Sequence, residues 1–485
     1  MEKLIFEYSK EGKKGFSLPD FEYKKIDDLI PEKFLRGKEP ELPEVSEPEV
    51  VRHFVKLSSM NHHVDKDFYP LGSCTMKYNP KVNDVLSTLP GFTELHPLQP
   101  VETVQGALQI LFEMERLLCE ITGMHSATLQ PAAGSHGELT GVLIMKKYHR
   151  SKGENREFVL IPDSAHGTNP SSVVSSGFKT LPLKSNEKGL VDIDDLRQKM
   201  NEKVAGLMLT NPNTLGLFEE EIEEIAKIVH SYDGIMYMDG ANLNALLGIV
   251  KPADMGFDIV HINLHKTFST PHGGGGPGSG PIAVNKNLEK YLPVPRVKEK
   301  NGKYFLDYEY PESIGKILSF YGNFEIIVKA YVYIRMLGTE GIKRVSRNAI
   351  LNANYLRVKL QDHYEIPYNR TCMHEFVASG KSLKEYGIKT LDVVKRLLDF
   401  GLHAPTIYFP LIVSEALMIE PTETESKDTL DRFVNAMIKI KEEAKENLDL
   451  LKEAPHNTPV RRINELKANK ELKVNWCIDK NGGGL

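Results

Sequence analysis

The stretch DIVHINLHKTFSTPHGGGGPGSGP (residues 258–281) sets the expectations for the whole chain. Half of its first eight residues are apolar, and this run predicts a strand that ends at His265 and Lys266. Glycines 273–276, 278 and 280 follow and predict a loop. A lysine at a strand end can be partly desolvated, which lowers its pKa and lets its amine form a Schiff base. An isolated lysine in such a place more often pairs with a carboxylate, so the rest of the chain has to decide between these interpretations.

Short apolar runs alternate with helical patterns before this stretch. The runs FVLIP (158–162), AGLMLT (205–210) and GIMYMD (234–239) predict strands, and the amphipathic segment 219–232 predicts a helix between two of them. An apolar stripe over 104–121 predicts a further helix that ends at a glycine. Alternating βα units of this kind predict an α/β fold with a mostly parallel sheet covered by helices. Ligands of such sheets bind at the carboxyl ends of the strands.

Composition and patterning divide the chain into four predicted parts. Residues 1–100 are rich in proline and charge and predict an extended arm that reaches a second subunit. Residues 101–325 form the predicted large domain. Helical patterns that begin near residue 327, interleaved with strand-like runs such as HEFVAS (374–379), predict a smaller α+β domain over 326–455. Residues 456–485, which include the only tryptophan, form a tail without an assigned role.

Composition also excludes several classes of protein. The 485 residues are 41% hydrophobic and 26% charged with a net charge of −5, so no basic excess indicates a nucleic-acid partner or an anionic membrane surface. Four cysteines are scattered without a CxxC pair, which predicts neither a disulfide framework nor a metal site. The first residues lack the apolar core of a signal peptide, and no run approaches the roughly 18 apolar residues of a membrane span. We expect a cytoplasmic protein.

Polar residues follow five consecutive strand ends, and each alone has an ordinary structural explanation. Small residues before a helix, for example, expose backbone N–H groups that could hold a phosphate. Together, and in this order, the five ends offer the parts of a pyridoxal phosphate site. These parts are a phosphate cradle at Gly134 and Ser135, a ring-stacking and proton-transferring histidine at His166, a hydroxyl at Thr210, a carboxylate for the ring nitrogen at Asp239, and the Schiff-base lysine Lys266.

This order resembles the aspartate-aminotransferase-type fold (fold type I) of pyridoxal phosphate enzymes. Longer strings carry a closer resemblance, which covers about residues 55–460. They are YPLGSCTMKYNP (69–80), QPAAGSHGEL (130–139), SAHGTNP (164–170), MDGAN (238–242) and NLHKTFSTPHGGGGPGSGP (263–281). These strings are similar to those of glycine dehydrogenase (decarboxylating), the P-protein family of the glycine cleavage system. Members of this family are either one long chain of two homologous halves or two separate chains.

The resemblance implies the catalytic second subunit of the two-chain form. Such a subunit decarboxylates glycine with pyridoxal 5'-phosphate held covalently on Lys266, and passes the remaining aminomethyl group to the lipoyl arm of H-protein. The implied partners are a homologous first subunit in an α2β2 assembly, lipoylated H-protein and glycine. The resemblance also implies further site residues: His265 near the phosphate, Ala241 on the ring face opposite His166, and Ser73, Thr75 and Asn79 at the entrance.

Two other interpretations stay open. A different enzyme of the same fold, such as a cysteine desulfurase or an amino-acid decarboxylase for a larger substrate, is one. A desulfurase needs a mobile catalytic cysteine near the site, and Cys74 lies in the motif 69–80. The other is a non-catalytic half that supports a complex without holding a cofactor. Such a half has no need to keep both Lys266 and Asp239.

Overall fold

The computed structural model describes residues 2–17, 29–38, 40–272 and 275–472. The chain forms two compact units, of which one comprises residues 67–454 and the other residues 1–66 together with 455–485. The last residues of the predicted tail, with Trp476 and Cys477, and the first two glycines of the run 273–276 lie outside the described residues. In the smaller unit the elements are η1 (Ile5–Tyr8), η3 (Glu32–Phe34), α1 (Glu47–Ser59) and α14 (Glu465–Lys470).

Helix α1 lies in the predicted arm, where the sequence pattern predicted extended chain. The Glu49 carboxylate accepts hydrogen bonds of 2.9 Å from both the backbone N–H and the hydroxyl of Ser46, which closes a capping box. Pro48 lies in the first turn, where its missing N–H has no cost. The string SEPE (46–49) is therefore a helix start.

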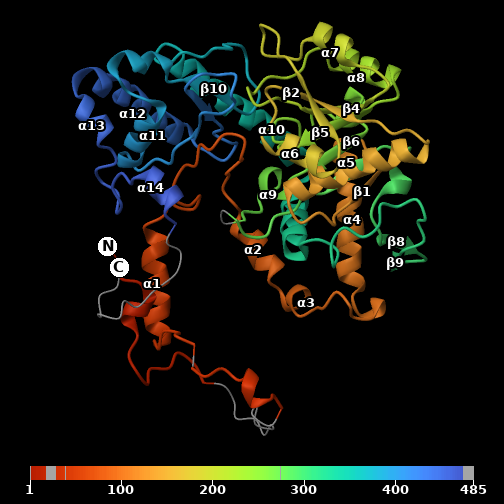
Figure 1. The fold of residues 1–485 in the computed structure, drawn as a ribbon, viewed down its shortest axis with the longest axis horizontal. Coiled ribbons are helices and arrows are strands. Elements are labelled where there is room, and N and C mark those ends of the chain that lie inside the picture. The colour runs from red at the N-terminus through yellow and green to blue at the C-terminus, as the bar shows by residue number, and fades with distance from the viewer. Residues whose placement is uncertain (1, 18–28, 39, 273–274, 473–485) are drawn as a thin grey trace. The chain divides into compact units, whose positions relative to one another are not determined.

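In the described part of the larger unit, seven strands form one sheet in the order β1-β7-β6-β5-β4-β2-β3 (Figure 1). Neighbours from β6 to β3 are parallel, whereas β7 is antiparallel to both of its neighbours. The predicted mostly parallel sheet is confirmed. The strands are β1 (Ser126–Thr128), β2 (Phe158–Pro162), β3 (Lys179–Leu183), β4 (Val204–Thr210), β5 (Ile235–Gly240), β6 (Ile259–Ile262) and β7 (Ile282–Val284).

Helices cover both faces of this sheet, and side chains alternate between the two faces along each strand. Leu207 and Leu209 of β4 join the core under α4 and α8, whereas Met208 joins the core under α5 and α6. Helix α4 ends at Gly123, whose φ of 74° is the left-handed conformation expected of a terminating glycine. The helices of this domain are α4 (Gln105–Thr122), α5 (Gly134–Ser151), α6 (Thr168–Ser175), α7 (Ile193–Lys199), α8 (Ile222–Ser231) and α9 (Leu264–Thr267).

Short elements complete this domain. The run 258–265 gives a strand only as far as Ile262, after which the chain turns into α9. A two-stranded hairpin, which the sequence pattern did not predict, turns at Asn301 and Gly302, both with positive φ. These elements are α2 (Lys81–Ser87), α3 (Pro90–Thr93), η4 (Val101–Thr103), η5 (Pro252–Met255), η6 (Glu289–Tyr291), β8 (Arg296–Lys300) and β9 (Lys303–Asp307).

A smaller α+β domain with its own apolar core follows. Its sheet has the order β10-β12-β11 and is antiparallel. The helical segment α10 (Phe324–Leu360) leads into it and consists of two helices that meet at a kink at Gly338, whose φ of 59° and ψ of −174° are not helical. The other elements are β10 (Phe376–Ser379), η7 (Lys381–Tyr386), α11 (Thr390–Asp399), β11 (Thr406–Ile407), β12 (Ala416–Ile419), α12 (Lys427–Glu446) and α13 (Leu448–Lys452).

Residues 67–100 of the predicted arm belong to the same compact unit as both domains. Leu71 forms an antiparallel bridge with Ile419 of β12, and the Thr406 hydroxyl donates a 2.8 Å hydrogen bond to the Gly72 carbonyl. Backbone contacts of Leu71 and Gly72 therefore hold this segment against the small sheet. Within the residues that the structure describes, no helix has both the length and the apolar character needed to cross a membrane.

Candidate active site

A cavity of about 220 Å³ lies at the carboxyl ends of the parallel strands. Larger hollows, of about 450, 420, 360 and 270 Å³, are lined by none of these strand ends. The smaller cavity brings together all eight residues predicted to bind the cofactor, and Ser73 from the predicted entrance. The eight are Gly134, Ser135, His166, Thr210, Asp239, Ala241, His265 and Lys266.

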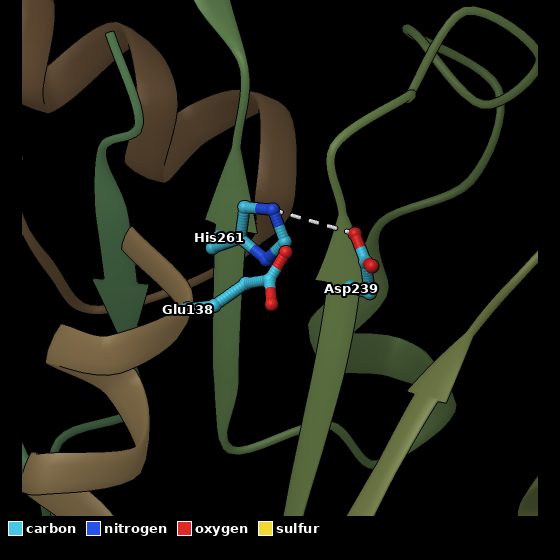
Figure 2. A group of neighbouring side chains, drawn as sticks. All are labelled: Glu138, Asp239 and His261. Atoms are coloured by element: carbon cyan, nitrogen blue, oxygen red, sulfur yellow. Dashed lines mark ion pairs between the residues drawn. The ribbon is translucent and has the colours of Figure 1, made fainter. Parts of the chain in front are cut away.

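Sheet register places the central polar residues side by side. Thr210 at the end of β4 pairs with Asp239 of β5, which in turn pairs with His261 of β6. Because these residues share one face of the sheet, their side chains lie on the side that α5 covers. Glu138 of α5 approaches the pair from this side, and Figure 2 shows the contact between Asp239 and His261 as a dashed line.

Asp239 is only 3% exposed, yet three groups stabilise its charge. The Asn169 amide donates a 2.8 Å hydrogen bond to Oδ2 and the Ala241 N–H donates a 3.0 Å bond to Oδ1. His261 Nε2 lies 3.3 Å from the same Oδ1. Burial alone would raise the pKa of Asp239, but His261, Asn169 and Ala241 together hold it below the ordinary value. An ionised, buried carboxylate of this kind can hold a protonated group of a ligand.

Glu138 fixes the loop that carries His166. Its two carboxylate oxygens accept hydrogen bonds from the Thr168 hydroxyl at 2.7 Å and the Ser172 hydroxyl at 2.8 Å. His166 Nδ1 lies 2.8 Å from the Thr168 hydroxyl. Burial, and next the nearby Lys266 charge, lower the pKa of His166, which favours a neutral imidazole in the cavity.

Lys266 lies in the short helix α9 directly after β6, and its Nζ donates a 2.9 Å hydrogen bond to the Ser73 carbonyl. Ser73 has a left-handed backbone, with a φ of 62°. Its own N–H donates a 2.7 Å bond to Glu375 Oε2. The neighbouring His265 has its pKa lowered to about 3, first by burial and then by the Lys266 charge. Its Nδ1 accepts the Ser279 N–H at 3.1 Å, as a neutral ring can.

The start of α5 has the shape of an anion cradle. Its first intrahelical bond runs from the Gly137 N–H to the Ala133 carbonyl, so the N–H groups of Gly134 and Ser135 have no partner inside the helix. A Cβ on Gly134 would lie 2.7 Å from the Asn263 side chain, and one on Gly280 would lie 2.1 Å from the Ala133 carbonyl. Only glycine permits this close approach of loop and helix.

Several buried polar atoms at the cavity have no hydrogen-bond partner in the protein. They include the Thr210 hydroxyl and Asn263 Oδ1, both from residues that line the cavity, and the neighbouring Ser279 hydroxyl. Unsatisfied polar atoms are rare inside proteins because each one costs free energy. Their position beside Lys266, Asp239 and the α5 start fits a polar ligand that carries an anionic group.

The other two predicted entrance residues do not line the cavity. The Thr75 hydroxyl donates a 2.7 Å bond to Glu420, and the Asn242 amide contacts the same hydroxyl. Asn79 is buried, and its side chain bonds only to Asp84 and Asn83 among the described contacts. Thr75 therefore supports the wall behind the cavity, whereas Asn79 stabilises the start of α2.

Sequence reasoning missed several residues of this site, namely Glu138, Asn169, His261, His374 and Glu375. His261 could have been found because it is a polar residue inside an apolar strand. His374 and Glu375 could have been found because they are polar residues directly before the strand at 376–379. Asn169 gave no such signal, because its contact with Asp239 joins residues 70 positions apart.

Comparisons with known proteins agree with this geometry. Residues 9–303 match the family model of the glycine cleavage system P-protein, and residues 345–460 match that of the glycine dehydrogenase C-terminal domain. A probable glycine dehydrogenase (decarboxylating) subunit 2 from Caldanaerobacter subterraneus subsp. tengcongensis is 60% identical over 476 residues, 98% of each chain. Its counterpart from Chloroherpeton thalassium is 57% identical over 481 residues, again 98% of each chain.

Solved structures share the fold. A glycine decarboxylase (P-protein) crystal structure in inhibitor-bound form superposes with a TM-score of 0.73 at 22% identity, covering 86% of this chain and 95% of that one. A glutamate decarboxylase from Lactobacillus brevis gives 0.65 at 12% identity, with coverages of 86% and 97%. These likenesses establish the α/β architecture, with the seven-stranded sheet and the smaller C-terminal domain.

Proposed function

We propose that this chain decarboxylates glycine and transfers the remaining aminomethyl group to the lipoyl arm of H-protein. The premise is its family, because the chain belongs to the glycine cleavage system P-proteins. The observation that carries the proposal is the meeting of Lys266 and an ionised Asp239 in one cavity at the carboxyl edge of the sheet. A scaffold half without chemistry has no use for a buried charge of this kind, whose desolvation is costly.

The cofactor that we propose is pyridoxal 5'-phosphate, carried covalently by Lys266. When bound, it supplies an electron sink for the electron pair that departing CO2 leaves behind. The start of α5, at Gly134 and Ser135, would hold its phosphate, and the unpartnered Thr210 hydroxyl would bond its ring hydroxyl.

The protein's own groups would hold the reacting part in place. Asp239 is ionised and would keep a proton on the ring nitrogen, as the electron sink requires. His166 and Ala241 would pack on opposite faces of the ring, with His166 also able to move a proton. His265, neutral near pH 7, would lie beside the phosphate without adding charge.

The small size of the cavity favours glycine over larger amino acids as the substrate. A cavity of about 220 Å³ that also has to hold a cofactor leaves little space for a side chain on the substrate, so larger amino acids would be rejected by contact. A desulfurase activity is disfavoured. Burial raises the pKa of Cys74, which leaves this thiol protonated, whereas the nucleophile of a desulfurase is a thiolate.

The partners in this proposal are a companion chain and H-protein. The curated relatives are named subunit 2, so we propose a homologous first subunit that joins this chain in an α2β2 assembly in the cytoplasm. The boundaries at residues 325 and 455 are part of the proposal, and residues 1–66 take the place of residues 1–100 as the arm that contacts the companion chain.

Isotope exchange tests the reaction. Labelled bicarbonate is incubated with unlabelled glycine, this chain, its companion subunit and lipoylated H-protein, and label in the glycine carboxyl group is measured with each component omitted in turn. We expect full exchange from the complete mixture and poor exchange without the companion. An inactive complete mixture would overturn the glycine assignment, whereas full exchange by this chain and H-protein alone would overturn the partner assignment.

A further inference from the structure

Two buried glutamates and a histidine meet at the side of the cavity that the small domain supplies. His374 and Glu375 directly precede β10, and Glu420 directly follows β12. The register of these strands sets Glu375 opposite Glu420. All three residues are at most 3% exposed, and one polar atom of each lies within 4.8 Å of the others. His374 and Glu375 line the cavity that contains Lys266, whereas Glu420 lies behind them.

Hydrogen bonds distinguish the two glutamates. Glu420 accepts three bonds, from the Thr75 N–H at 2.9 Å, the Thr75 hydroxyl at 2.7 Å and the Asn242 amide at 2.9 Å. Glu375 Oε2 accepts the Ser73 N–H at 2.7 Å, and its Oε1 lies 3.7 Å from His374 Nε2. Three donors favour the ionised form of Glu420, so a single negative charge on the pair would reside there.

The charges around Glu375 keep a proton on it. Burial, and then the Glu420 charge across the strand pair, raise the pKa of Glu375 well above its ordinary value. The Ser73 N–H and the Lys266 ammonium oppose this rise without cancelling it. Burial also lowers the pKa of His374, which therefore faces Glu375 as a neutral ring. Cys74, whose thiol also has a raised pKa, adds no charge near pH 7.

This wall retains unused hydrogen-bonding capacity. His374 is 2% exposed, and its buried Nδ1 has no partner. Among the described residues that line the cavity, Lys266 is the one amine, and no arginine is present to receive a substrate carboxylate. The neutral carboxyl group of Glu375 and the His374 ring are the donors that remain on this side.

We propose that His374 and Glu375 form the subsite for the carboxylate of glycine, with Glu375 in its neutral, proton-carrying form. The inference rests on the proposed function. Neutral donors suit a carboxylate that leaves as uncharged CO2, because a cation would stabilise the bound carboxylate more than the charge-depleted transition state. Glu420 acts as a positioning residue, since its charge behind Glu375 keeps the proton in place.

The protonation state is tested without turnover, by thermal unfolding of the full chain between pH 5 and 9. A carboxyl group with a raised folded pKa stabilises the protein fully below its unfolded pKa, and this stability is lost as pH rises through the folded pKa. Glu375→Gln removes the titration but keeps the shape. We therefore expect the variant to gain unfolding temperature relative to the wild type as pH rises, and parallel curves would overturn the proposal.

Glu219→Gln is the matched control for that comparison. Glu219 is 2% exposed, and burial raises its pKa to about 7, but it does not line the cavity. Its substitution should produce the same pH-dependent gain, flattening above about pH 7, while leaving the KM for glycine unchanged.

The subsite itself is tested by KM in the reconstituted exchange assay. His374→Phe and Glu375→Leu should raise the KM for glycine about tenfold without changing the KM for H-protein, since each removes a hydrogen bond to a charged group. Glu375→Gln should stay near the wild-type KM at pH 7 and should lack the rise of KM that we expect of the wild type at alkaline pH. Normal wild-type exchange with an unchanged glycine KM in both His374→Phe and Glu375→Leu would overturn the subsite alone. An inactive wild-type mixture would instead overturn the proposed function.

Discussion

Asp239 combines deep burial with an ionised carboxylate, an arrangement that the Asn169 amide and the Ala241 N–H support directly. The substitution Asp239→Asn keeps the size of the side chain and removes its charge. We expect the variant to bind cofactor but to lose glycine decarboxylation about a hundredfold, the usual cost of removing one preorganised electrostatic contact. The control is Asp258→Asn, which changes a carboxylate directly before β6, at the edge of the sheet away from the cavity. The exchange rates of the two variants are compared. Near-normal exchange in Asp239→Asn would assign the ring nitrogen to another group.

His265 makes a prediction about acid stability. Its pKa in the folded protein is about 3, so the unfolded chain binds the proton first as pH falls. The free energy of unfolding therefore decreases from about pH 6.5 downward because of this residue. His265→Gln removes the contribution, and its unfolding temperature should fall less between pH 6.5 and 4 than that of the wild type. If the unfolding temperatures of the two proteins fell equally over this pH range, His265 would take up its proton in the folded protein as readily as in the unfolded chain.

Residues at strand ends could be predicted from the sequence, because each follows a recognisable apolar run. Lys266, Asp239 and Thr210 all line the cavity as expected. Contacts that depend on register or on distant chain could not be predicted. His261 meets Asp239 only because two strands pair in one register, and His374 comes from the other domain.

At the scale of elements, the close contact between α5 and the loop before β7 decides the shape of the cradle. A Cβ on Gly280 would lie 2.1 Å from the Ala133 carbonyl, a distance that requires the backbone to move. Gly280→Ala should lower the free energy of unfolding by about 1–3 kcal/mol, as overpacking does, and weaken cofactor binding. Chemical denaturation and absorbance titration measure the two effects.

Gly106→Ala in α4 is the control for that substitution, because its Cβ would meet no atom within 4 Å. It should stabilise the protein by up to about 1 kcal/mol through helix propensity alone. Equal effects of the two substitutions would show that the cradle tolerates a side chain at position 280.

Lys77 holds the segment 69–80 against both domains. Its Nζ bonds to Asn244 Oδ1 at 2.9 Å and Tyr333 Oη at 3.2 Å, and forms a 2.9 Å ion pair with Glu423. Lys77→Met leaves the Glu423 carboxylate, whose side chain is 9% exposed, without its cation and should cost about 3–5 kcal/mol of unfolding free energy in urea. Adding Glu423→Gln should recover part of this loss.

The exposed pair of Lys152 with Asp233 is the control for this ion pair, since its side chains are 41% and 45% exposed. Lys152→Met should cost less than about 1 kcal/mol. A similar small cost for Lys77→Met would mean that the segment 69–80 is not held by this contact.

Element prediction was most reliable where periodicity was strong. FVLIP became β2 without a shift, and the apolar stripe became α4. Helix α1 and the hairpin of β8 and β9 were missed, although a capping box and an Asn-Gly turn were present in the sequence. Both signals are only a few residues long, so they stand out less than a repeated apolar pattern.

At the scale of the molecule, the site is built from three separate parts of the chain. The large domain supplies the strand ends, the small domain supplies His374 and Glu375, and the segment 69–80 places Ser73 between Lys266 and Glu375. A sequence pattern identifies the strand ends but not this convergence, because it requires residues about 300 positions apart to meet.

Identification of the lysine that carries the cofactor tests the central claim most directly. The purified protein, loaded with pyridoxal 5'-phosphate, is treated with borohydride and digested, and its peptides are mapped by mass spectrometry. We predict a pyridoxyl group on Lys266, and no labelled peptide from a folded Lys266→Ala variant. A label on another lysine, or none in a protein that exchanges glycine carboxyl carbon, would contradict the assignment of the reaction to this cavity.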